Sequence, residues 1–208
     1  MALATVAPYT YMNPYDFIGP VIVLGALILL VGAGYLILKF ILGGGTVSSK
    51  IESAKRGYYY LLSFITLSIL YFAASDTLSL LLSTITGSNY YGYSYENFAR
   101  GIALRAAVLI VVLPVYIYHW FAASKQVLSP DEEVRSFAQR ERKGYVQIVL
   151  TFSTIILIIT GVRFIYLLLL LGLGVSGVEL SSFTMPFSYS LGILAIWLYH
   201  LKILKENS

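Results

Sequence analysis

Cysteine is absent from the sequence of 208 residues, and charged residues are scarce. Without cysteine the chain has no disulfide, no thiolate metal ligand and no cysteine nucleophile. Charged residues make up 12% of the chain, hydrophobic residues make up 58%, and the mean hydropathy is +0.80. Ordinary soluble domains carry about 25% charged residues, so this composition predicts an integral membrane protein.

Sequence motifs of catalysis are also absent. There is no H-E-x-x-H, no G-x-S-x-G and no group of carboxylates inside an apolar run. Metalloprotease and serine hydrolase mechanisms therefore have no residues to act through. We predict no catalytic residues, no metal site and no enzymatic activity.

Five apolar runs are long enough to cross a membrane, because a spanning helix needs about 20 residues. They are residues 17–42, 57–86, 98–122, 144–174 and 186–204. No Lys or Arg precedes the first run, so it lacks the positive start of a secretory signal and is predicted to remain as a membrane helix. The sequence thus predicts an all-α membrane protein with five transmembrane helices.

Basic residues predict the orientation of these helices. If the five spans are correct, 11 of the 14 Lys and Arg residues lie on one side of the membrane. They are Lys39, Lys50, Lys55, Arg56, Lys125, Arg135, Arg140, Arg142, Lys143, Lys202 and Lys205. The positive-inside rule places this side in the cytoplasm, so in the cell membrane we expect the N-terminus outside and the C-terminus in the cytoplasm. Because the positive charge follows membrane borders, it does not indicate a nucleic-acid partner.

Two stretches of the sequence resemble each other at a fixed spacing. The basic-Gly-Tyr start at Gly57 recurs at Gly144, and the same shift of 87 residues places Asp76 over Arg163. The Tyr-His pairs that contain His119 and His200 also match, at a shift of 81 residues, in the helices that follow. We interpret this as a duplicated helical hairpin. Both copies start on the same side, so the expected core is a four-helix bundle with one added N-terminal helix.

The duplication divides the chain into three segments. Residues 1–46 hold an external segment and the first helix, residues 47–125 the first hairpin and residues 126–208 the second hairpin. Ser129, followed by Pro130 and by Glu132 three residues after the serine, predicts the N-cap of the second hairpin. Ser49 and Glu52 predict the same capping box for the first hairpin.

Three charged residues remain inside the predicted spans: Asp76, Arg105 and Arg163. At 1.5 Å per residue they all lie in one layer of the outer leaflet. A charge there costs about 2 to 3 kcal/mol, and pairing reduces this cost. We therefore expect an intramembrane ion pair in which Asp76 bridges Arg105, Arg163 or both and joins the two halves. An anion, lipid-headgroup or proton site, and independent snorkelling of each side chain, are the alternatives.

The two histidines, His119 and His200, lie near the cytoplasmic ends of equivalent helices. Neutral imidazole is a good axial ligand, so a symmetric pair of histidines could hold a haem or a chlorin pigment. Tyrosine and histidine at a helix end also match the aromatic belt of a membrane protein.

Longer sequence patterns carry a family resemblance. The basic-Gly-Tyr start, R-G-I-A-L-R at 100–105, L-P-V-Y-I-Y-H-W at 113–120 and the later R-K-G-Y together resemble a bacterial family of integral membrane proteins catalogued as a domain of unknown function. The resemblance covers roughly residues 50–205 and implies a repeated two-helix fold, without an activity or functional residues.

The function that these observations favour is a non-catalytic membrane subunit that packs against and stabilises a larger membrane protein complex. We expect other integral membrane proteins and bound lipids as partners, and no cofactor. A haem- or pigment-binding redox or photosynthetic subunit that uses His119 and His200 is one alternative. A small transporter is another, although the broken helices and polar midplane of transporters are missing.

Overall fold

The computed structural model describes residues 47–86 and 95–206, which belong to one compact unit from Gly45 to Ser208. Within these residues the chain is helical and contains no strand. The elements are α2 (Val47–Ile85), α3 (Tyr95–Ser124), η1 (Lys125–Leu128), α4 (Glu132–Gly172), η2 (Leu180–Phe183) and α5 (Thr184–Glu206), where η marks a short 3-10 helix.

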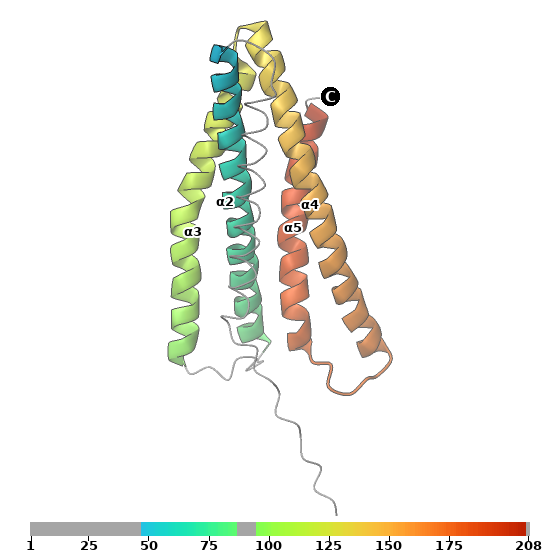
Figure 1. Cartoon of the computed structure of the whole chain (residues 1–208). Helices are drawn as coiled ribbons and strands as arrows, with labels where there is room; N and C mark the ends of the chain where they lie inside the picture. The colour runs from blue at the N-terminus through green and yellow to red at the C-terminus, as the bar shows by residue number, and fades with distance from the viewer. Residues whose placement is uncertain (1–46, 87–94, 207–208) are drawn as a thin grey trace, which may run out of the picture. The chain divides into compact units, whose positions relative to one another are not determined.

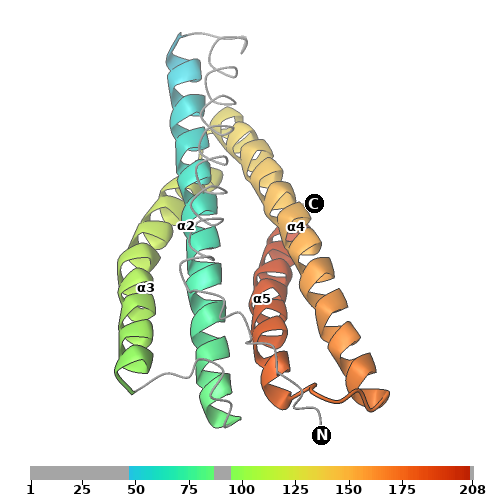
Figure 2. The ribbon, with the colours of Figure 1, turned by 60° about the horizontal axis from the view of Figure 1, so that its bottom comes forward.

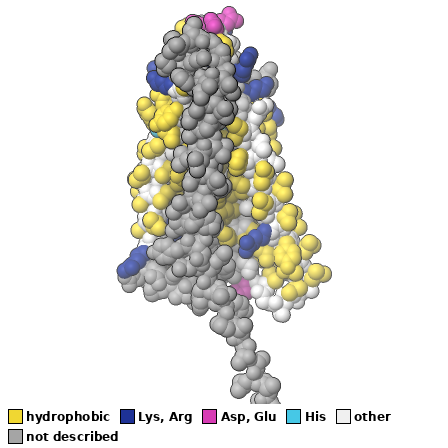
Figure 3. Space-filling view, viewed as in Figure 1, with side chains coloured by type: hydrophobic (Ala, Val, Ile, Leu, Met, Phe, Trp, Pro, Cys, Tyr) yellow, Lys and Arg dark blue, Asp and Glu magenta, His cyan; other side chains and the backbone are white. Residues whose placement is uncertain are grey.

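All four α-helices are long and apolar enough to cross a membrane. In Figure 3, hydrophobic side chains make up much of the coloured surface between the two ends of the visible face, and Lys and Arg side chains lie toward those ends. An all-α protein with helices of membrane-spanning length is therefore confirmed. The first predicted span, residues 17–42, lies outside the described residues.

The four helices form two antiparallel hairpins, α2–α3 and α4–α5 (Figure 1). In Figure 1 and in the turned view of Figure 2, α2 and α5 lie side by side, whereas α3 and α4 lie at the two outer edges. The hairpins are therefore joined mainly along α2 and α5. α3 and α4 have little contact. The arrangement is compatible with the predicted helical bundle, and the duplication of the hairpin stays a prediction.

Small residues allow α2 and α5 to approach closely. On α2, Ser75, Ser79 and Ser83 are spaced by one turn and buried, and on α5 Ser188 and Gly192 have the same spacing. A Cβ atom at Gly192 would lie 2.6 Å from Ser75 Oγ, closer than real side chains come. In lipid, where apolar side chains gain little by leaving the solvent, such small-residue contacts are what hold helices together.

Hydroxyl side chains inside the unit bond mainly to their own helix. Ser63 Oγ donates to the Tyr59 carbonyl at 2.8 Å, and Ser188 Oγ donates to the Thr184 carbonyl at 2.7 Å. These bonds satisfy the hydroxyl groups one turn back along the helix, where no water reaches them. Ser63 and Ser188 can therefore line a membrane interior with their hydroxyl groups paired, whereas Ser75 Oγ is buried without a hydrogen-bond partner among the described residues.

The start of α4 differs from the sequence prediction. The N-cap is Asp131, whose carboxylate accepts hydrogen bonds from the Glu133 and Val134 backbone N–H groups. The predicted cap, Ser129, instead ends η1, and its hydroxyl accepts a hydrogen bond from the Asp131 N–H at 3.3 Å. Because Ser129 is the C-cap of the 3-10 helix, the N-cap of α4 lies two positions later, at Asp131. Ser49, the other predicted cap, lies inside α2, which begins at Val47.

A glycine just after the C-terminal end of α4 stops the helix. Gly174 has a φ of +68°, in the left-handed region that favours glycine. The Val175 N–H donates to the Leu170 carbonyl and the Gly174 N–H donates to the Leu171 carbonyl, both at 3.1 Å. This pair of bonds is a Schellman motif, which turns the chain toward α5.

Substitution of Gly192 by valine should separate α2 from α5. The new Cβ would meet Ser75 Oγ at 2.6 Å and the Tyr71 ring at 3.4 Å, and the γ-methyl groups prevent relief by rotation of the serine. We expect a loss of about 1 to 3 kcal/mol in the free energy of unfolding in detergent, measured by denaturant titration. The matched control is Gly161→Val on α4, where a Cβ meets no atom within 4 Å. Equal losses in the two variants would contradict the close approach of α2 and α5.

Candidate functional site

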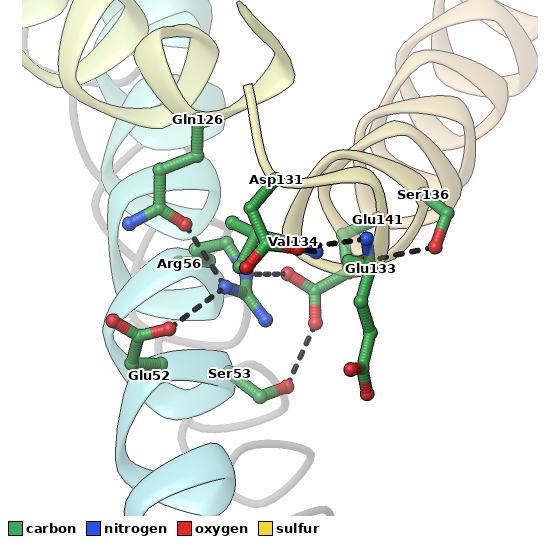
Figure 4. Close-up of polar contacts among 9 residues, drawn as sticks. All are labelled: Glu52, Ser53, Arg56, Gln126, Asp131, Glu133, Val134, Ser136 and Glu141. Atoms are coloured by element: carbon green, nitrogen blue, oxygen red, sulfur yellow. Dashed lines mark hydrogen bonds and ion pairs between the residues drawn. The ribbon is translucent and has the colours of Figure 1, made fainter. Parts of the chain in front are cut away.

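The most extensive polar network of the described residues lies where α2 and α4 begin and α5 ends, which we call the basic end. Arg56 of α2 is buried there, and its Nε donates to Glu141 Oε2 of α4 at 2.6 Å (Figure 4). Arg56 Nη1 also donates to Gln126 Oε1 of η1 at 2.9 Å and lies 3.7 Å from the Glu52 carboxylate. Ser53 donates to the other Glu141 oxygen at 2.7 Å. This network, the Arg56–Glu141 clasp, ties the two hairpins together.

One helical turn further along α2 and α4, aromatic side chains replace the charged ones. Tyr60 follows Arg56 by four residues and Tyr145 follows Glu141 by four residues, so each pair lies on one helix face. The Tyr60 and Tyr145 rings stack with their centroids 5.0 Å apart. The hydrophobic core therefore begins directly against the clasp.

α3 and α5 complete this layer with Trp120 and His200. The Trp120 ring lies 5.5 Å from Tyr145 and 6.1 Å from His200, centroid to centroid, and the Arg142 guanidinium lies 5.6 Å from the Trp120 ring centroid. We call Tyr60, Trp120, Arg142, Tyr145 and His200 the aromatic cluster. All four membrane-spanning helices contribute to it.

The two histidines have different surroundings. His200 is 0% exposed, and its Nδ1 donates to the Ile196 carbonyl at 2.9 Å. His119 Nδ1 donates to the Val115 carbonyl at 2.7 Å, and its ring contacts Tyr58, at 6.0 Å between centroids. Among the described residues, no ring contact joins the two histidines, so they do not form a symmetric pair of ligands around one site.

A haem or chlorin does not fit at His200 as it stands. The Trp120, Tyr145 and Tyr199 rings surround the imidazole, and no surface remains open. A macrocycle needs an open face at the axial nitrogen. In residues 47–86 and 95–206, no three His, Asp or Glu side chains gather in a way that could hold a metal ion.

The structure pairs two of the three predicted intramembrane charges, Asp76 and Arg105. Arg105 Nε donates to Asp76 Oδ2 at 2.6 Å, and Arg105 Nη1 donates to the Gly101 carbonyl at 2.9 Å. Both side chains of the ion pair are mostly buried. Arg163 lies on an exposed part of α4 and has no ion-pair partner among the described residues.

The expectation that this ion pair joins the two halves requires correction. Asp76 lies on α2 and Arg105 on α3, so the pair fastens the first hairpin internally. Arg163 cannot take part in the same way, because α4 lies at the outer edge beyond α5 (Figure 1). The hairpins are instead joined by the Arg56–Glu141 clasp and by the hydrogen bond that the Tyr71 hydroxyl donates to the Tyr189 carbonyl at 3.2 Å. In the sequence, Arg56 indicated the orientation of the helices, and its pairing with Glu141 was not predicted.

A family model matches more than half of the chain. The model of a family described as Domain of unknown function (DUF5671) matches residues 56–199. A search of curated proteins and a search of solved structures found no match. The matched segment begins at the arginine of the clasp and ends next to His200.

Loss of the carboxylate from the clasp should weaken the junction between the hairpins. Glu141→Gln leaves the buried Arg56 guanidinium with only the exposed Glu52 carboxylate, 3.7 Å away, as a counter-charge, and we expect a loss of about 3 kcal/mol in the free energy of unfolding. The control is Glu206→Gln, which removes an exposed ion pair with Lys202 at 3.9 Å. That pair should contribute less than about 0.5 kcal/mol. Similar values for the two variants in denaturant titrations would show that the clasp does not hold the hairpins together.

The Asp76–Arg105 pair should stabilise the first hairpin. Asp76→Asn removes the charge without changing the shape, and we expect a loss of about 1 to 2 kcal/mol in the free energy of unfolding. Arg163→Gln is the control, because its side chain is exposed and has no partner among the described residues; we expect a change below about 0.5 kcal/mol. Heat resistance of the detergent-extracted Asp76→Asn protein equal to that of the wild type would refute the stabilising role.

Proposed function

The chain belongs to the DUF5671 family, and we propose that it is a non-catalytic, multi-pass membrane subunit that packs against another integral membrane protein. The polar side chains described above support this proposal. The Arg56–Glu141 clasp and the Asp76–Arg105 pair connect helices to one another.

The proposed duplication of the hairpin is supported by equivalent contacts. The Tyr58 and His119 rings lie 6.0 Å apart in the first hairpin, and the matching Tyr145 and His200 rings lie 6.0 Å apart in the second. Both histidines use Nδ1 to bond a carbonyl one turn back. Two copies of one ancestral hairpin would retain such a pair of contacts.

The observation that carries the proposal is the unequal burial of these equivalent pairs. In the second hairpin, Tyr145 is 5% exposed and His200 is 0% exposed, because α2 and α3 cover them. In the first hairpin, Tyr58 is 48% exposed and His119 is half-buried, whereas Tyr118 (62%) and its counterpart Tyr199 (47%) are exposed in both copies. We call Tyr58, Tyr118 and His119 the open edge. A surface that one copy of the hairpin buries in a protein interface is a natural docking surface on the other copy.

The apolar sides of α3 and α4 would also contact a partner protein. The most apolar stretches of both helices have no buried residues within the described unit, whereas those of α2 and α5 are partly buried. Lipid or a partner helix can cover them. The open edge adds a polar and aromatic contact that would fix the position of a partner, since aromatic residues are enriched among the residues that dominate binding energy.

We place the basic end in the cytoplasm. The described Lys and Arg residues of η1 and of the first turns of α4 gather there, together with those of the start of α2 and the end of α5. The positive-inside rule supports this orientation. The open edge would then lie near the cytoplasmic membrane border.

Copurification from native membranes tests the proposed function. We expect the wild-type chain in mild detergent to retain a stoichiometric set of larger membrane proteins, and Tyr58→Ala to retain about tenfold less, because loss of an interface aromatic costs more than about 1.4 kcal/mol. Tyr166→Ala is the control, since Tyr166 is similarly exposed on α4. A lone homo-oligomer would instead favour the small transporter. Absorbance in the visible range would favour the pigment or haem alternative, which would have to use His119, because His200 is enclosed.

A further inference from the structure

A crevice between α2 and α4 is lined mainly by apolar side chains. It has about 350 Å³ of free space, its open side included. α2 and α4 form its two walls, and Ile193 and Ile196 form its floor, because α5 packs against both of these helices. Figures 1 and 2 show that α2 and α4 move apart with distance from the basic end. The crevice lies where this divergence leaves the space between the two helices incompletely filled.

The crevice is too narrow for another helix. The Phe64 ring of α2 and the Phe152 ring of α4 meet across it, with their centroids 5.2 Å apart. A helix with its side chains is about 10 to 12 Å wide. The Ser68 hydroxyl, which lines one wall, donates to the Phe64 carbonyl at 2.8 Å and so needs no polar ligand. A single hydrocarbon chain is the occupant that suits this space.

Arg163 lies on the side of α4 that lines the crevice. Ile156 follows Phe152 by four residues and Arg163 follows Ile156 by seven, so the three residues share one face of the helix. The Arg163 side chain is exposed and has no ion-pair partner among the described residues. A cation on a membrane-spanning helix is costly without a counter-charge, so this face calls for an anion next to a hydrocarbon chain.

The depth of Arg163 matches a lipid headgroup. Arg163 follows Gly144, where the apolar stretch of α4 begins, by 19 residues, which is about 28 Å of helix. The hydrocarbon core is about 30 Å thick, so Arg163 reaches the headgroups on the side opposite the basic end. Ile156 and Phe152 lie about 10 and 16 Å deeper along α4. An acyl chain that runs from these headgroups to the bilayer midplane, a depth of about 15 Å, ends in the crevice.

We infer that the unit binds one phospholipid, with its phosphate at Arg163 and the end of one acyl chain in the crevice between α2 and α4. The planar guanidinium presents two parallel N–H donors, which match two oxygens of a phosphate. The apolar walls cover the end of the chain. One molecule thus supplies both the counter-charge and the apolar filling. The inference does not rest on the proposed protein partner, because a lipid can bind with or without one.

Two single-chain probes that differ only in the phosphate test the headgroup contact. Lysophosphatidic acid or a monoacylglycerol with the same acyl chain is added to the delipidated full chain in mild detergent, and native mass spectrometry measures the bound fraction. We expect the wild type to bind lysophosphatidic acid about tenfold more tightly, and Arg163→Gln to bind the two probes almost equally. The control, Lys143→Gln, removes an exposed cation near the other end of the apolar stretch and should keep the preference.

Two results of this experiment would overturn the headgroup site. Loss of the preference in both Arg163→Gln and Lys143→Gln would show that general surface charge attracts the phosphate. A wild type that binds neither probe, or binds both equally, would show that Arg163 holds no phosphate.

Ser68→Leu tests the crevice. The larger side chain takes up free space there, and the hydroxyl that it removes bonds a carbonyl of its own helix. We expect both probes to bind about threefold to tenfold more weakly, with no fall in the Tm of the delipidated protein. Thr151→Leu is the matched control, because Thr151 Oγ1 donates to the Gln147 carbonyl in the same way at an exposed position of α4. It should leave the binding of both probes unchanged.

Unchanged binding in Ser68→Leu would overturn the inference, and a lower Tm with unchanged binding would show that protein fills the crevice instead. If Ser68→Leu does not fold, Ile156→Phe adds less volume to the other wall and carries the same expectation. None of these outcomes depends on whether a protein partner copurifies.

Discussion

The close approach of α2 and α5 is the constraint on which the rest of the unit depends. In lipid, helices gain little from hiding apolar side chains, so they associate where small residues bring their backbones together. Ser75 and Gly192 provide such a place between the two hairpins. The clasp at the basic end follows from this contact, because Arg56 can reach Glu141 only if α4 is held near α2 by its own hairpin partner, α5.

Three arginines show how the environment of a cation decides its role. Arg56 is buried and matched by Glu141, so it fastens two hairpins. Arg105 is matched by Asp76 within one hairpin, and its further bond to the Gly101 carbonyl fixes the side chain along its own helix. Arg142 has no carboxylate partner among the described residues and is held against Trp120, 5.6 Å from the ring centroid. Its planar guanidinium makes a cation–π contact that joins α4 to α3.

The fold class and the hairpins could be predicted from hydropathy, and the partners of individual side chains could not. Long apolar runs separated by charged loops are enough to predict antiparallel spanning helices. These helices carry apolar residues on all sides, so hydropathy does not show which side of α2 faces α5. The row of Ser75, Ser79 and Ser83 was a visible signal for that side, because small residues four apart mark a contact surface in membranes. The Asp76–Arg105 ion pair could be predicted because the depth of both residues in the membrane follows from their positions along the helices. The Arg56–Glu141 pair could not, because it depends on how each helix is rotated about its axis.

The arrangement of the hairpins also explains why one copy of a repeated surface stays uncovered. If α2 corresponds to α4 and α3 to α5, a closed two-fold bundle would repeat the α2–α5 contact between α4 and α3. α3 and α4 have little contact, so the interface between the hairpins uses different surfaces of the two copies. Such a heterologous interface does not close on itself and leaves one equivalent surface free on each side. On the proposed duplication, the Tyr58–His119 contact belongs to a surface of this kind.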